Sequence, residues 1–184
     1  TYFRMQSIRQ LERVLADLAT SERYLFTAAD LRPACSPSAN PAVLLSRAVK
    51  AGILRRVCRG IYLYPRVDFP RGRVLFHAAA RLRANTFNYV SLETALSDAG
   101  AISQVPFDRI TLMSSGRTNV ISCGGYGRIE FVHTARRPDG LVGQLTYDPA
   151  CRLWRASPAL ALRDMRATHR DLNLVNPEVI RELV

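Results

Sequence analysis

The stretch of residues 43–65, VLLSRAVKAGILRRVCRGIYLYP, constrains the fold of this chain most strongly. It predicts a helix that ends at Gly52, followed by two short β-strands joined by a tight turn at Arg59 and Gly60. Glycine at such a turn can take the positive φ that a two-residue hairpin needs. A helix followed by a basic hairpin is typical of a winged helix-turn-helix, in which a recognition helix precedes a wing.

Three helices are predicted before this hairpin. Apolar side chains recur at helical spacing over residues 7–19, and Thr27 is a good cap for a short helix over residues 28–33. Asn40 and Pro41 begin the third helix, because asparagine caps free backbone N–H groups and proline there loses no hydrogen bond. The residues of this helix that we expect in the core are Leu45, Ala48 and Val49, with Leu44 at the margin.

The opposite face of the third helix carries polar and cationic groups. Such groups can reach base edges when a helix enters the major groove, and arginines on a hairpin can contact phosphates or enter the minor groove. A polar helix face can also be exposed only to water. The basic hairpin that follows the helix is therefore the feature that favours DNA binding. The predicted DNA-binding residues are Asn40, Val43, Ser46, Arg47, Lys50, Arg55, Arg56 and Arg59.

The charge of the chain is strongly positive and unevenly distributed. The formal net charge is +11, and of the 26 basic residues only Lys50 is a lysine. Residues 1–72 carry 12 basic and 5 acidic side chains (+7), whereas residues 73–184 carry 14 and 10 (+4). An arginine bias can reflect a GC-rich genome. The excess of positive charge on residues 1–72, the shorter part of the chain, is however what a polyanion-binding domain requires.

The second half of the chain predicts a small α+β domain. A linker near residues 69–73 divides a winged helix-turn-helix domain over residues 5–68 from an α+β domain over residues 73–184. Alternating residues predict strands near 110–112, 120–121 and 129–133, with a further strand at 144–147. Helices are predicted over 74–84 and, with Ser91 as the cap, over 92–99, and others begin at Ser157 and Asn176. The predicted fold class is therefore α+β, with a mostly antiparallel sheet in the second domain.

Two segments resemble a known family. KAGILRRVCRGIYLYP is similar to the wing of AbiEi-family antitoxins, which are the transcriptional regulators of type IV toxin–antitoxin systems. YVSLETALSDAGAI, from Tyr89 to Ile102, resembles a helix of the same family, and ASPALALRDM resembles its proline-led helix, with Ala161, Leu162 and Asp164 as the nearest matches. The resemblance implies an autorepressor that binds promoter inverted repeats, two copies on one site, and is functionally linked to a nucleotidyltransferase-like toxin.

Catalytic and cofactor signals are missing from the sequence. Four separated cysteines and three scattered histidines predict neither a metal site nor disulfides, and no pattern predicts a cofactor or catalytic residues. We therefore expect a protein that is not an enzyme; a hidden nuclease or transferase site would involve Glu93 or Asp98. No membrane span or export signal is predicted, so we expect a cytoplasmic protein, with residues 1–4 derived from a vector.

One rival to DNA recognition comes from a different class. The basic hairpin could instead serve an RNA-binding or toxin-binding interaction module that does not read a DNA sequence. Both hypotheses use the same arginines, so competition between duplex DNA and structured RNA separates them.

Overall fold

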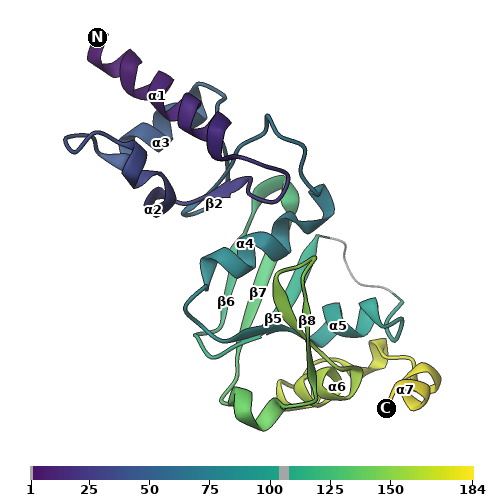
Figure 1. The fold of residues 1–184 in the computed structure, drawn as a ribbon. Helices are drawn as coiled ribbons and strands as arrows, with labels where there is room; N and C mark the ends of the chain where they lie inside the picture. The colour runs from purple at the N-terminus through teal and green to yellow at the C-terminus, as the bar shows by residue number, and fades with distance from the viewer. Residues whose placement is uncertain (1, 104–107) are drawn as a thin grey trace. The chain divides into compact units, whose positions relative to one another are not determined.

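The chain forms two compact units, Thr1–Gly72 and Arg73–Val184 (Figure 1). The structure is a computed structural model that describes residues 2–103 and 108–184, with the backbone alone for residues 2–7. Thr1, the first of the four residues expected to derive from a vector, lies outside the described residues. Each unit contains its own sheet, and each is described separately below.

The first unit is a winged helix-turn-helix. Its short strand β1 joins the hairpin strand β3, so that all three strands form one antiparallel sheet in the order β1-β3-β2. The predicted hairpin is confirmed, but β1 was not predicted. The elements are α1 (Tyr2–Leu18), β1 (Leu25–Phe26), α2 (Ala28–Leu31), the 3-10 turn η1 (Arg32–Ala34), α3 (Pro41–Lys50), β2 (Arg55–Cys58) and β3 (Ile61–Leu63).

Helices α2 and α3 begin as their cap residues predict, whereas α1 begins at Tyr2, five residues before the predicted start of the first helix. Thr27 and Asp30 form a capping box: the Thr27 hydroxyl accepts from the Asp30 N–H, and the Asp30 carboxylate accepts from the Thr27 N–H at 2.8 Å. The core lies between the helices and the sheet. On α3 the predictions for two residues were wrong, since Leu44 lies in the core and not at its margin, and Val49 is only half-buried. The buried core residues are Leu11, Leu15, Phe26, Leu31, Leu44, Leu45, Ala48, Ile53, Leu54 and Tyr64.

The second unit contains a six-stranded sheet in the order β6-β7-β5-β4-β9-β8. Three neighbouring pairs are antiparallel (β6 with β7, β5 with β4, β9 with β8), and two are parallel (β7 with β5, β4 with β9). The predicted α+β class and mostly antiparallel sheet are confirmed. The strands are β4 (Asn88–Val90), β5 (Arg109–Ser114), β6 (Asn119–Ser122), β7 (Arg128–His133), β8 (Leu145–Asp148) and β9 (Leu153–Ala156).

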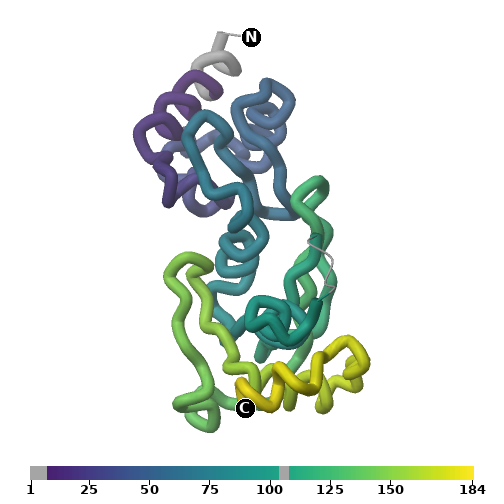
Figure 2. The backbone as a smooth tube through the Cα atoms, turned by 90° about the vertical axis from the view of Figure 1, so that its right-hand side faces the viewer, coloured from purple at the N-terminus to yellow at the C-terminus, as the bar shows by residue number. Residues whose placement is uncertain are grey.

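Helices cover both faces of this sheet. On one face, Thr111 of β5 hydrogen-bonds Thr94 of α5. On the opposite face, Leu112 of β5 lies beside Phe131 of β7, and Arg83 at the end of α4 lies over the Phe131 ring. The last two helices lie side by side (Figure 2, yellow). The helices are α4 (Val74–Leu82), α5 (Leu92–Asp98), α6 (Pro158–Ala167) and α7 (Pro177–Leu183), with 3-10 turns η2 (Arg71–Arg73), η3 (Gly124–Tyr126), η4 (Pro138–Leu141) and η5 (Leu172–Leu174). None of the helices among the described residues has the length and apolar character that a bilayer span requires.

A buried carboxylate ties the second unit together. Asp164 of α6 is completely buried and accepts hydrogen bonds from Tyr89 Oη at 2.9 Å and Ser91 Oγ at 2.8 Å. Arg136 adds an ion pair at 3.2 Å. Ser91 was expected to cap α5, but its hydroxyl is donated to Asp164 and makes no cap hydrogen bond. The two segments of the second unit that resemble the AbiEi family in sequence, one with Tyr89 and Ser91 and the other with Asp164, therefore meet at the buried Asp164 carboxylate.

Candidate nucleic-acid interface

Helix α3 is fixed at both ends by side-chain and backbone hydrogen bonds. The Asn40 side-chain oxygen Oδ1 accepts from the Ala42 N–H at 3.0 Å, and Pro41 occupies the first position, as predicted. At the other end Gly52 has φ +71, and the Ile53 N–H reaches back to the Ala48 carbonyl at 2.9 Å. Since the Asn40 oxygen is engaged in capping, this residue positions the helix start.

The outward face of α3 presents the residues that the sequence singled out. Val43 is 44% exposed, Ser46 and Lys50 are exposed, and Arg47 is half-exposed. A helix of 10 residues is about 15 Å long, and the major groove of B-DNA is about 12 Å wide and admits an α-helix. The exposed stripe therefore combines an apolar group, a hydroxyl and two cations on a rigid element of suitable size.

The hairpin β2–β3 forms the wing. Cys58 pairs with Ile61 across the two-residue turn, where Gly60 has φ +85. The register shifts between Arg56 and Cys58, which is a bulge. Val57 points inward and is buried, while Arg55, Arg56 and Arg59 are all exposed.

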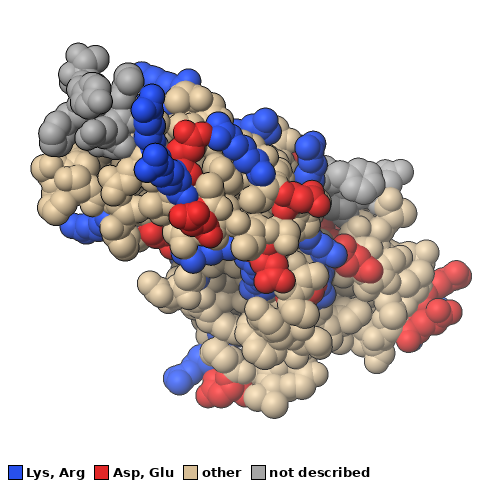
Figure 3. Space-filling model, turned by 45° about the horizontal axis from the view of Figure 1, so that its top comes forward, with Lys and Arg blue, Asp and Glu red and all other residues tan. Residues whose placement is uncertain are grey.

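The interface is basic without local compensation. Residues 31–67 contain seven basic side chains and no acidic one. Of the described residues, none forms an ion pair with Arg47, Lys50 or any of the three wing arginines, whereas Arg66 is paired with Glu12. That pairing raises the pKa of Arg66. On the face drawn in Figure 3, blue and red side chains are interspersed, so the surface is not uniformly basic and the excess of cations is local to residues 31–67.

Two further residues of this surface were missed from the sequence. Arg32 is exposed in η1, between α2 and α3, and Tyr62 is half-exposed directly opposite Arg56 on the wing. The absence of acidic side chains from residues 31–67 was the sequence feature that could have identified Arg32. Tyr62 had no signal of its own, because its position opposite Arg56 depends on the bulged register.

The carboxylates considered for a hidden enzymatic site are engaged in ion pairs. Glu93 pairs with Arg170 at 3.5 Å, and Asp98 pairs with Arg155. Over residues 2–103 and 108–184, no group of three or more His, Cys, Asp or Glu side chains is arranged to hold a metal ion. The exposed surface of the first unit offers hydrogen-bond donors and cations, the groups that contact phosphates and base edges.

Comparison with known proteins bears on the first unit. Residues 13–65 match the model of a family described as a transcriptional regulator, AbiEi antitoxin. This match spans α2, α3 and both wing strands. No curated protein matches the chain. The resemblance to the AbiEi antitoxin family of transcriptional regulators is therefore confirmed over residues 13–65.

Proposed function

We propose that the first unit binds duplex DNA as the regulator of a type IV toxin–antitoxin system. In this proposal α3 enters the major groove with Val43, Ser46, Arg47 and Lys50, and the wing arginines contact phosphates or the minor groove. Asn40 and Gly52 hold the helix ends. The observation that carries the proposal is the run of cations on α3 and the wing, which form no ion pair with any described residue, in a winged helix-turn-helix whose residues 31–67 contain no acidic side chain.

The two parts of the interface should contribute differently. Phosphate contacts by the wing give affinity that is independent of sequence and weakens with salt. Side chains of α3 that reach base edges give specificity, with each good contact worth about 1–3 kcal/mol. Variants of the two parts therefore differ in a measurable way.

The proposal is tested by measuring affinity for two duplexes of equal length, one from upstream of the protein's own reading frame and one of random sequence. Arg47→Ala and Ser46→Ala should weaken binding to the upstream duplex by about 5- to 150-fold per lost base contact and leave random-duplex affinity nearly unchanged. Arg163→Ala, which removes an exposed arginine from α6 of the second unit, is the matched control. Equal losses on both duplexes would contradict base recognition by α3.

The antitoxin role rests on the family match and not on the geometry. We propose that the second unit opposes a nucleotidyltransferase-like toxin and that the protein itself is not an enzyme. Co-expression with the product of a neighbouring nucleotidyltransferase-like frame should restore growth, and deletion of residues 73–184 should abolish the rescue. A full rescue by the first unit alone would show that repression suffices.

An RNA-binding module remains the rival proposal, because phosphates are common to both nucleic acids. Competition at matched salt between duplex DNA and structured RNA for the full chain distinguishes them. The DNA proposal expects duplex DNA to compete at lower concentration, since an A-form major groove is too deep and narrow for α3.

A further inference from the structure

Val43 is the one large apolar side chain that is exposed among the described side chains of residues 8–72. It is 44% exposed and lies in the first turn of α3. Of the described residues, those that pack against the core of the first unit do not include it. The α3 side chains that hold the helix on the core are instead Leu44, Leu45 and Ala48. Val43 therefore contributes little to the packing of the fold.

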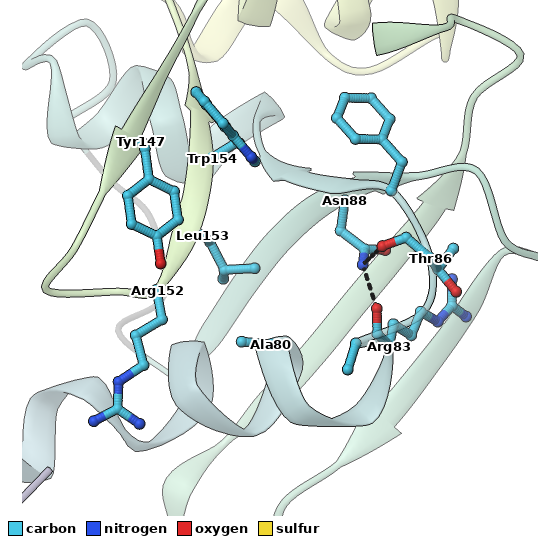
Figure 4. A pocket seen from close by; sticks show the side chains of 10 residues that line it. Ala80, Arg83, Thr86, Asn88, Tyr147, Arg152, Leu153 and Trp154 are labelled. Atoms are coloured by element: carbon cyan, nitrogen blue, oxygen red, sulfur yellow. Dashed lines mark hydrogen bonds between the residues drawn. The ribbon is translucent and has the colours of Figure 1, made fainter.

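The exposed aromatic side chains of the second unit, by comparison, contact each other. Tyr147 and Trp154 face each other across β8 and β9, with ring centroids 5.5 Å apart, beside a hollow of about 240 Å³ (Figure 4). Cross-strand pairing of this kind stabilises a sheet. A single exposed apolar residue is common on protein surfaces, so the significance of Val43 depends on what surrounds it.

The surroundings of Val43 on α3 are polar. Successive residues of an α-helix turn by about 100°, so the hydroxyl and the two cations of the exposed stripe all project within about 60° of Val43. A groove that receives these polar groups also receives Val43. Valine is a poorer helix former than alanine or lysine, because the helix restricts its χ1 angle, so a face that met only water would be more stable without it.

The major groove of B-DNA displays one apolar group. Each A·T pair presents the C5-methyl group of thymine there, and apolar side chains recognise this methyl by direct contact. The other groups on the base edges are hydrogen-bond donors and acceptors, which a valine side chain cannot satisfy. The chemistry of Val43 therefore fits thymine better than any other base.

We propose that Val43 reads a thymine in the major groove by contact with its C5-methyl group. The inference rests on the proposed duplex binding by α3 and adds the identity of one base pair in the recognised site. Arg47 lies four residues further along, about 6 Å on the helix axis. Since successive bases are roughly 3.4 Å apart, the thymine lies within about two base pairs of the base that Arg47 contacts when α3 follows the groove.

The test replaces thymine by deoxyuridine in the duplex from upstream of the protein's own reading frame, one position at a time on both strands. Deoxyuridine keeps the base pairing and every hydrogen-bonding group and removes only the methyl. Replacement at the contacted thymine should weaken binding of the full chain about fourfold, as loss of one buried methyl group does. The contacted position should lie within two base pairs of the one where Arg47→Ala relaxes the base preference.

Variants of Val43 assign the methyl effect to this side chain. Val43→Ala should weaken binding to the unmodified duplex about fourfold and lose no more affinity at the deoxyuridine position, because the contact is already absent. Val43→Thr keeps one methyl group and should keep the sensitivity to deoxyuridine. Thermal stability should not fall in Val43→Ala, since alanine is a better helix former at an exposed position.

Val120→Ala is the matched control, because Val120 is a valine of the second unit that is 51% exposed. It should bind both duplexes as the unchanged protein does. The thymine contact is overturned if no deoxyuridine position weakens binding, or if the loss at that position is the same in Val43→Ala, which would assign the effect to duplex shape or another side chain. In either case preference for the upstream duplex over random sequence would remain, and the proposed function would stand. Equal binding of the unchanged protein to upstream and random duplexes would contradict the proposed function and the thymine contact together.

Discussion

Removal of the Asp164 carboxylate should strongly destabilise the second unit. In Asp164→Ala the hydroxyls of Tyr89 and Ser91, both completely buried, lose their acceptor, at about 1–3 kcal/mol each. Arg136 adds little, because its side chain is 38% exposed and can be hydrated. Relief of the buried carboxylate's own desolvation opposes these losses. The expected decrease in the free energy of unfolding is therefore at the lower end of the sum, about 2–4 kcal/mol.

Urea denaturation followed by Trp154 emission measures this decrease, since the single tryptophan lies in the second unit. Glu182→Ala, which removes an exposed carboxylate from α7, should change stability by less than about 0.5 kcal/mol. Tyr89→Phe should cost about 1 kcal/mol, and its effect should nearly vanish when Asp164 is already Ala. A loss in Asp164→Ala no larger than in Glu182→Ala would refute the assigned role of the buried carboxylate.

Further predictions concern pH, turns and a helix cap. Burial lowers the pKa of His77 below its usual 6.5, so the unfolded chain binds the proton first and stability should fall as pH drops below about 6.5; His77→Gln should remove this slope in urea titrations between pH 7 and 5. Gly60→Ala should cost about 1–2 kcal/mol from its positive φ alone, whereas Gly127→Ala should cost more, because its Cβ would also overlap the Asp108 carbonyl; calorimetry ranks the two. Asn40→Ala should lose about 1 kcal/mol of stability by the same measurement, and a neutral result would contradict its capping role.

Local signals were sufficient for most elements of the fold. Thr27, Asn40 and Ser157 each make the cap hydrogen bond that their sequence context predicts. Apolar residues at alternate positions located β5 and β7, and the apolar pair Val120 and Ile121 located β6. β4 is three residues long and buried at every position, so it has no alternation to detect. Its parallel partner β9 is more than 60 residues away in sequence, and such pairing follows from the assembled sheet and not from local pattern.

The candidate surfaces differ in how far the sequence could predict them. The α3 face and the wing are each built from one continuous segment, so helical spacing and a turn glycine suffice to place them. The Asp164 network combines residues from separate elements. Ser91 illustrates the limit: in sequence it is a good helix cap, and only the position of α6 makes it a donor to Asp164.

The salt dependence of duplex binding tests the central claim most directly. For B-DNA the slope of log K against log salt is about −0.9 per neutralised phosphate, so changing Arg55, Arg56 and Arg59 together to Ala should make the slope shallower by up to about 2.7. The matched control changes three exposed arginines of the second unit, Arg163, Arg166 and Arg181, to Ala and should leave the slope as it is. An unchanged slope in the wing variant, or an equal change in the control, would contradict DNA binding through the wing.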